Sequence, residues 1–255
     1  MANNFDVAII GAGIVGAACA LECAEAGLSV AIIEAGVIGG GATAAGMGHI
    51  VAMDDSEAQF ALTRYSQELW LQLAPELPRD IEFERAGTIW IAADEEEMSA
   101  VRKKYHYYNS RRVPAEILDV RALADAEPHL RTGLVGGLLV PQDAVIYSPT
   151  AARWIAQRAL DRGATLIRKR VIAASGTHLK LADDSTVSCG FTVNATGTWA
   201  PELTPGVEIK KRKGHLVITD RYPGFIRHQL VELGYLKSAH SLTSDSVAFN
   251  VQPRS

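Results

Sequence analysis

Three glycines and one glutamate near the start of the chain have the types and spacing that suit dinucleotide binding. The glycines are Gly11, Gly13 and Gly16, and the acid is Glu34. In this pattern the first glycine makes a tight turn, the second lets a pyrophosphate approach the backbone, and the third lets a helix lie close to a strand. The helix start attracts phosphates through its free N–H groups and its dipole. The Glu34 carboxylate suits ribose hydroxyls and would repel a 2′-phosphate, which argues against NADP.

The elements that must position these residues occur in the right order. Residues 5–10 predict a strand, the glycines open a helix that runs to Gly27, and residues 30–33 predict a second strand that ends at Glu34. The acid lies at the expected distance of about 20 residues. A glycine-rich strand–turn–helix without a ligand is the alternative, and this context makes it the weaker one.

A segment of small residues follows Glu34, where a nicotinamide-binding domain normally has a short loop. Residues 36–48 are mostly glycine and alanine, and Thr43 carries the only hydroxyl. The backbone and hydroxyl of such a segment can lie along an extended ligand. A flexible linker is the alternative, but linkers seldom contain Ile, Met and Val as this segment does. We therefore expect contact with the ligand.

The composition indicates an ordinary globular protein. Of 255 residues, 48% are hydrophobic and 21% charged, and the net charge of −4 gives no reason to expect a nucleic-acid partner. We interpret the basic run 210–213 as a solvated strand entry rather than a polyanion site. The uncharged stretch 7–21 is shorter than the roughly 20 residues that span a bilayer. It also lacks the preceding basic residue of a signal peptide, so we expect no membrane span.

Three cysteines are too few for a disulfide framework. Cys19 and Cys23 lie one turn apart on the first predicted helix, and we interpret them as small packing residues in a reducing compartment. Metal ligation by this pair is the weaker alternative. We expect a cytoplasmic protein without a metal site.

Several further elements can be predicted from local signals. Ser56 and Asp119 are expected to cap helices. Residues 81–83 and 87–92 resemble paired strands, and residues 207–251 alternate like antiparallel strands.

The order of these elements predicts an α/β fold with two domains. A Rossmann-like cofactor domain is expected at residues 1–80 and 147–206, and a discontinuous antiparallel-sheet (α+β) substrate domain at residues 81–146 and 207–255. The cofactor domain is split because a strand-rich insert separates its two α/β pieces.

Three segments together resemble the D-amino-acid oxidase (DAO) family of FAD-dependent oxidoreductases. They are the fingerprint 11–34, the small-residue stretch 40–47, and residues 193–200, which contain the Ala-Thr-Gly-x-Trp pattern of a second FAD contact. Their order and separation make the combination specific. The resemblance is greatest to glycine-oxidase-like and D-hydroxyproline-dehydrogenase-like members.

The resemblance implies an extended FAD. Glu34 would meet the adenosine ribose, the Val171 backbone would meet the adenine, and Gly197 would approach the pyrophosphate. The residues that the resemblance assigns to FAD are Gly11, Gly13, Gly16, Glu34, Gly41, Ala42, Thr43, Gly46, Met47, Gly48, Val171, Ala195, Thr196, Gly197 and Trp199.

The resemblance also implies oxidation of a C–N bond by hydride transfer to flavin N5. The substrate would be an amine or amino acid of the D-amino-acid, glycine, sarcosine or D-hydroxyproline class. No catalytic triad is expected, because the flavin performs the chemistry. His49 is the candidate for proton handling, with a packed histidine as the alternative. His215 and Tyr235 are weaker candidates.

Members of this family continue beyond the point that corresponds to Ser255. The resemblance therefore implies that a last strand, a helix and an arginine for the substrate carboxylate are missing. A non-catalytic or truncated flavoprotein subunit is accordingly an alternative function, with a partner subunit or a second copy as its binding partner. An NAD-dependent dehydrogenase is a less favoured alternative, because the segment after Glu34 is long.

Overall fold

The computed structural model of the chain describes residues 3–211, 214–220, 222–234 and 249–254. The chain divides into two compact units, each made of two segments. Unit 1 comprises Met1–Gly48 and Tyr147–Val217, and unit 2 comprises His49–Ile146 and Ile218–Ser255.

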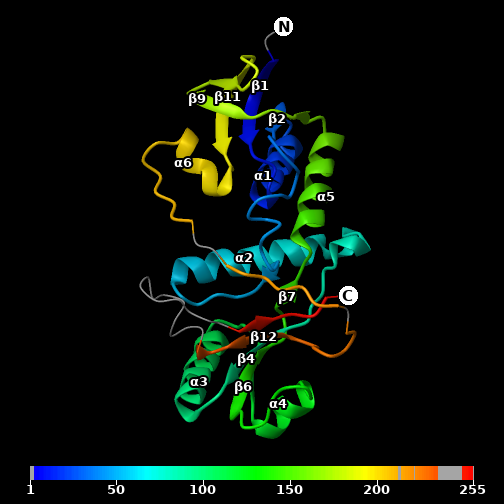
Figure 1. The fold of residues 1–255 in the computed structure, drawn as a ribbon, viewed down its shortest axis with the longest axis vertical. Helices are drawn as coiled ribbons and strands as arrows, with labels where there is room; N and C mark the ends of the chain where they lie inside the picture. The colour runs from blue at the N-terminus through cyan, green and yellow to red at the C-terminus, as the bar shows by residue number, and fades with distance from the viewer. Residues whose placement is uncertain (1–2, 212–213, 221, 235–248, 255) are drawn as a thin grey trace. The chain divides into compact units, whose positions relative to one another are not determined.

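Unit 1 contains a six-stranded sheet in the order β8-β2-β1-β11-β10-β9. Its strands are β1 (Asn3–Ile10), β2 (Val30–Ile33), β8 (Thr165–Ile167), β9 (Val171–Ser175), β10 (His178–Leu181) and β11 (Thr186–Asn194). Strands β8, β2, β1 and β11 are parallel, and β10 and β9 continue the sheet as an antiparallel meander. Figure 1 shows β1 beside β2 and β11. Every residue of β2 is buried, as is usual for a parallel strand covered on both faces.

The helices of unit 1 are α1 (Ile14–Glu25), α5 (Ser148–Asp161), the 3₁₀ turn η3 (Gly197–Trp199) and the short α6 (Ala200–Leu203). Helices α1 and α5 pack against each other (Figure 1). The buried residues of α1 are small with one exception: Gly16, Ala17, Ala20, Leu21 and Ala24. Because these side chains are short, α1 can lie close to its neighbours, as the glycine pattern predicted.

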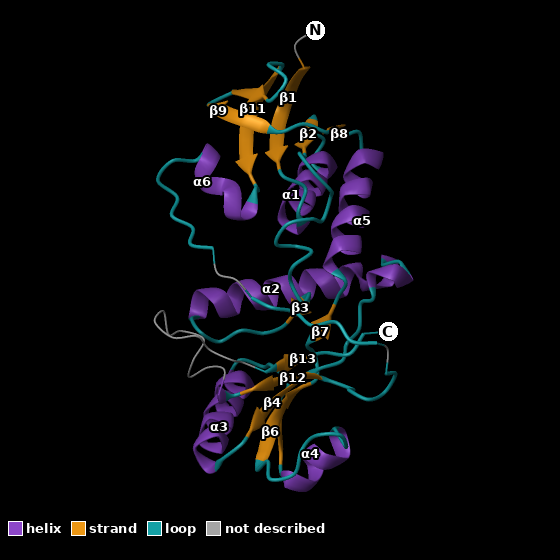
Figure 2. Ribbon diagram, viewed as in Figure 1, coloured by secondary structure: helices purple, strands orange, loops and turns teal. Residues whose placement is uncertain are grey.

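Unit 2 contains a mixed five-stranded sheet in the order β13-β12-β4-β6-β5 and a two-stranded ribbon of β3 and β7. The strands are β3 (His49–Ile50), β4 (Thr88–Ala92), β5 (Glu116–Leu118), β6 (Gly136–Val140), β7 (Ala144–Val145), β12 (Gln229–Glu232) and β13 (Asn250–Val251). The helices are α2 (Glu57–Leu73), α3 (Glu95–Ser110), α4 (Val120–Ala126) and the 3₁₀ turns η1 (Ala74–Glu76) and η2 (Arg79–Ile81). Figure 2 shows α3 and α4 on opposite sides of this sheet.

Alternate residues of β4 divide the core of unit 2 in two. Trp90 and Ala92 belong to one apolar cluster with the α3 residues Met98 and Val101. Ile89 and Ile91 belong to a second cluster, with Leu123 of α4. This period-2 division is why one strand supports a helix on each face of the sheet.

The predicted α/β class is confirmed by these sheets and helices. The predicted caps are also confirmed, since the Ser56 side chain accepts the Gln59 N–H and the Asp119 side chain accepts the Ala122 N–H.

The predicted domain boundaries differ from those of the compact units. Residues 49–80 lie in unit 2, and residues 207–217 lie in unit 1. Hydrogen bonds to Asp143 Oδ1 from Gln67 Nε2 (2.9 Å) and from the Ala52 N–H (3.1 Å) join this early segment to the rest of unit 2. These contacts are between residues far apart in sequence, so local patterns did not reveal them.

One strand prediction was wrong, and another was confirmed only in part. Residues 79–81 form the 3₁₀ turn η2, and Glu82 adopts a left-handed conformation (φ 52°) that interrupts any strand at 81–83. Antiparallel strands were expected across residues 207–251, and β12 and β13 do pair antiparallel. The described residues before Gln229 in this segment form no strand, and β12 also pairs in parallel with β4, which lies outside the segment.

No helix in the described part of the chain is long and apolar enough to cross a membrane. Within the same residues, no group of three or more His, Cys, Asp or Glu side chains could hold a metal ion.

Candidate cofactor site

The first glycine turn connects β1 to α1 in unit 1 and leaves no room for side chains. Gly11 has φ +98°, and a Cβ on it would lie 2.6 Å from the Ala195 carbonyl oxygen. A Cβ on Gly16 would lie 2.0 Å from the Gly11 carbonyl oxygen. The turn is also joined to the sheet, because the Gly11 N–H donates to the Ile33 carbonyl (2.8 Å). Glycine is therefore required here by close backbone contact as well as by conformation.

The N-terminus of α1 is capped by a residue from the small-residue segment. The N-cap residue Gly13 has no side chain, and the Ile14 N–H donates to Thr43 Oγ1 (3.0 Å). A Cβ on Gly13 would lie 3.1 Å from the same oxygen. Thr43 is thus placed at the helix end to which phosphates would bind.

The carboxylate of Glu34 lies against the same turn. Its Oε2 accepts the Ala12 N–H (2.7 Å), and its Oε1 accepts the Gly36 N–H (2.7 Å). Each carboxylate oxygen has a second lone pair, so both remain able to accept a further hydrogen bond. The carboxylate is oriented by the backbone at the carboxyl end of β2, where a ribose would bind in this fold.

The small-residue segment is folded and does not resemble a free linker. The Gly39 N–H donates to the Ala12 carbonyl (2.9 Å), and a Cβ on Gly39 would lie 2.7 Å from the Pro149 carbonyl oxygen. Gly41 and Gly48 also have positive φ, at 60° and 77°. Its backbone therefore follows a defined path over the glycine turn.

The second glycine turn follows β11. Asn194 Oδ1 accepts Thr196 Oγ1–H (2.6 Å), and Asn194 Nδ2 donates to the Ala200 carbonyl (3.0 Å). Gly197 has φ +60° and no heavy atom within 4 Å of where its Cβ would lie. Asn194 therefore holds the turn from within, while the Gly197 backbone stays open.

The structure brings most of the predicted FAD residues together in unit 1. Ala195 lies against Gly11, and the Trp199 ring lies 3.5 Å from the position of a Cβ on Gly41. Ala42 and Gly46 are exposed, and Met47 and Gly48 are half-buried along the same segment. Val171 is buried at the start of β9, in a core cluster with Ile10 and Ile33.

His49 is the first residue of unit 2, where β3 pairs it with Val145. Burial lowers the pKa of His49 to about 4, against a hydrogen bond with Gln252 that raises it; nearby Arg254 lowers it further. The imidazole is therefore neutral at neutral pH. Its role in proton handling stays a prediction. His215 is exposed, and Tyr235 lies outside the described residues.

Sequence reasoning missed two buried polar groups in unit 2. Asp143 Oδ1 accepts the Ala52 N–H (3.1 Å) and Gln67 Nε2–H (2.9 Å). Burial raises the pKa of Asp143 to about 6, although the hydrogen bonds from Ala52 and Gln67 act to lower it. These partners are separated by dozens of residues, so no motif could identify them.

The second group centres on Lys104, whose ammonium pairs with Asp54. Lys104 Nζ lies 4.3 Å from the centroid of the Trp90 ring and 5.0 Å from that of Tyr108. Only 5% of the lysine side chain is exposed, against 21% of the aspartate side chain, so the lysine is buried and its ammonium lies over two aromatic rings.

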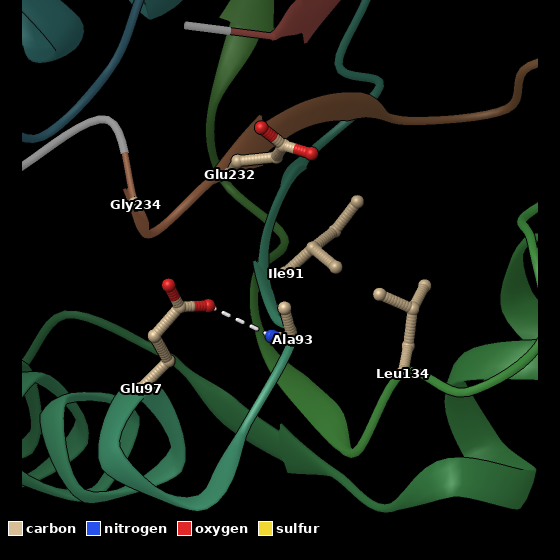
Figure 3. Close-up of a pocket in the computed structure, with 6 residues that line it drawn as sticks. All are labelled: Ile91, Ala93, Glu97, Leu134, Glu232 and Gly234. Carbon is tan, nitrogen blue, oxygen red and sulfur yellow. Dashed lines mark hydrogen bonds between the residues drawn. The ribbon is translucent and has the colours of Figure 1, made fainter.

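A small cavity of about 100 Å³ also lies in unit 2 (Figure 3). It is lined by Ile91, Ala93, Glu97, Leu134, Glu232 and Gly234. Glu97 Oε2 accepts the Ala93 N–H (2.7 Å), and the Glu97 N–H donates to Asp94 Oδ1 (2.8 Å). Glu97 is therefore part of the cap of α3, and none of the predicted FAD residues lines this cavity.

Comparisons with known proteins agree with this geometry. The family model described as "FAD dependent oxidoreductase" (DAO) matches residues 6–247. The chain is 30% identical over 215 residues to the glycine oxidase of Geobacillus kaustophilus (strain HTA426), a match that covers 80% of this chain and 57% of that protein. It is 27% identical over 209 residues to the mitochondrial pyruvate dehydrogenase phosphatase regulatory subunit of Mus musculus, covering 77% of this chain and 23% of that protein.

Among solved structures, the glycine oxidase from Geobacillus kaustophilus superposes with a TM-score of 0.79 at 26% identity. That superposition covers 91% of this chain and 66% of the other. The chain thus spans less than two thirds of the length of these relatives. Because the family model matches residues 6–247, which is nearly the whole sequence, the chain belongs to the DAO family of FAD-dependent oxidoreductases.

Proposed function

We propose that this chain binds FAD in unit 1 and belongs to an enzyme that oxidises the C–N bond of an amino acid or secondary amine. The observation that carries the proposal is the convergence of three segments in unit 1: the first glycine turn, the small-residue segment and the second glycine turn. The similarity to glycine oxidase supports an amino-acid or amine substrate.

The residues present fit FAD. The backbone around Gly11, Gly13 and Gly16 forms a cradle that side chains would fill, and a pyrophosphate would lie along it. Glu34 would accept hydrogen bonds from the adenosine ribose, and Thr43 with the backbone of Gly41 and Ala42 would contact the phosphate and ribityl part. The backbone of Gly197 would approach the pyrophosphate from the second turn, with Ala195, Thr196 and Trp199 beside it. Residues 46–48 would pass the isoalloxazine ring, and the Val171 backbone would meet the adenine.

The bound flavin would supply the acceptor for a hydride from the substrate α-carbon. The chain itself would orient the cofactor and exclude water around it. His49, which is neutral at neutral pH because its pKa lies near 4, would act as a hydrogen-bond acceptor.

The first test is the visible absorbance spectrum of the purified chain, before and after FAD is added. A bound-flavin spectrum supports the proposal. A folded protein that takes up no flavin at saturating FAD contradicts it.

The second test is turnover with glycine, sarcosine and D-proline, followed by peroxide formation and by dye reduction. Flavin binding without turnover favours the alternative, a flavoprotein subunit without chemistry of its own. The observation that supports this alternative is the similarity to the pyruvate dehydrogenase phosphatase regulatory subunit of Mus musculus.

We also propose a cytoplasmic location, supported by the three free cysteines Cys19, Cys23 and Cys189. A partner subunit or a second copy of the chain remains a prediction, which sedimentation of the purified protein would test.

A further inference from the structure

Three consecutive cations, Arg168 to Arg170, follow β8 in unit 1, and they differ in their partners. Lys169 Nζ pairs with Asp183 (2.5 Å), and Arg170 Nη2 pairs with Glu202 (2.9 Å). Among the residues that the structure describes, no carboxylate pairs with Arg168. The guanidinium of Arg168 therefore has a free face and a fixed charge at an exposed position.

Arg168 lies beside the predicted ribose site. It follows Ile167, whose carbonyl accepts the Glu34 N–H (3.0 Å). Its Nη1 reaches the Gly36 carbonyl at 3.5 Å, the long limit of a hydrogen bond, and the Gly36 N–H donates to Glu34 Oε1 (2.7 Å). The guanidinium thus contacts the turn at Gly36, whose N–H orients the Glu34 carboxylate.

We infer that Arg168 forms one face of the adenine subsite, with its planar guanidinium stacked on the base. This inference rests on the proposed function. The base is bonded to the ribose carbon next to the 2′-hydroxyl, so a ribose held by Glu34 puts the adenine within a few ångströms of this turn. Adenine is neutral and aromatic, and a planar, weakly hydrated cation is a suitable partner for its face.

The test uses the full chain and three variants, Arg168→Ala, Arg168→Lys and the control Arg170→Ala. The dissociation constant of FAD is measured by fluorescence titration, and that of ADP by competition with FAD. We expect Arg168→Ala and Arg168→Lys to weaken both ligands by about five- to tenfold, because lysine keeps the charge but loses the planar face. Arg170→Ala removes an arginine charge two residues further along the chain, where it pairs with Glu202, and should leave both constants unchanged.

Three results would overturn the inference. Wild-type affinity in Arg168→Ala would show that the side chain does not contact the ligand. Wild-type affinity in Arg168→Lys would show that charge alone matters. Equal weakening in Arg170→Ala would show a general loss of positive potential. Far-UV circular dichroism establishes that each variant is folded. If the wild-type chain itself binds no FAD, the proposed function fails and this inference fails with it.

Discussion

Units 1 and 2 organise their polar groups in opposite ways. In unit 1 the candidate site is made mainly of backbone groups, which glycines expose, and of two side chains, Glu34 and Thr43, which bind that backbone. In unit 2 the polar interior is made of side chains that bind one another, such as Lys104 with Asp54 and Gln67 with Asp143. The difference indicates that changes in unit 1 should act first on ligand binding, whereas changes in unit 2 should act first on stability.

Gly16→Ala should have the largest effect. The added Cβ would lie 2.0 Å from the Gly11 carbonyl oxygen, so α1 must move away from the turn. We expect loss of FAD binding and a fall of more than about 3 kcal/mol in the free energy of unfolding. Flavin titration and urea denaturation measure the two effects. Gly214→Ala is the control, since its Cβ would have no neighbour within 4 Å. If the two variants had the same FAD affinity and the same free energy of unfolding, the close contact between Gly16 and the Gly11 carbonyl oxygen would be refuted.

Asp54→Ala should be nearly as destabilising but should spare the ligand. It leaves the Lys104 ammonium buried without its carboxylate, which typically costs about 3 kcal/mol. Urea denaturation should show this loss, and FAD affinity under native conditions should stay at the wild-type value. Adding Lys104→Met removes the unpaired charge and should recover part of the stability. If Asp54→Ala weakened FAD binding tenfold, it would be wrong that changes in unit 2 act first on stability and not on ligand binding.

Asp143→Asn tests whether the pKa of the buried Asp143 carboxyl is raised, through the dependence of stability on pH. The pKa of Asp143 is raised from 3.8 to about 6 in the folded state. The contribution of this carboxyl to the free energy of unfolding is therefore greatest below pH 3.8, where it is protonated in both states, and it is lost as the pH rises from 3.8 through 6. Asparagine keeps both hydrogen bonds to Oδ1 and does not ionise. We expect the variant to gain about 2 to 3 kcal/mol relative to wild type between pH 4 and pH 7. A pH-independent difference in urea denaturation would count against the raised pKa.

Thr43→Val should have the smallest effect on the free energy of unfolding. It removes the acceptor of the Ile14 N–H and should cost about 1 kcal/mol. Thr43→Ser keeps the hydroxyl and should match wild type. Thermal unfolding without ligand is the measurement, and a loss of stability in Thr43→Ser comparable to that in Thr43→Val would mean that the methyl group matters instead.

The features that could be predicted from the sequence depend on residues close together in the chain. Ser56 and Asp119 are caps because their side chains bind N–H groups three residues later, and the turn at Gly11 is specified within a few residues. Residues 49–80 were expected in the cofactor domain but lie in compact unit 2, where Gln67 donates a hydrogen bond to Asp143, a residue far away in the sequence. The pairing of β12 with β4 is equally non-local. The individual FAD contacts remain predictions.

The pairing of β1 with β11 also constrains how the chain can fold during synthesis. Ile10 lies opposite Asn194, and Gly11 packs on Ala195, so the first strand receives its central neighbour only after most of the chain has been made. At about 5 to 20 residues per second, the β1 edge would wait roughly 10 to 40 seconds on the ribosome. Throughout that interval the apolar residues Val7 to Ile10, which are buried in the completed sheet, would lie along an edge that still lacks its neighbour.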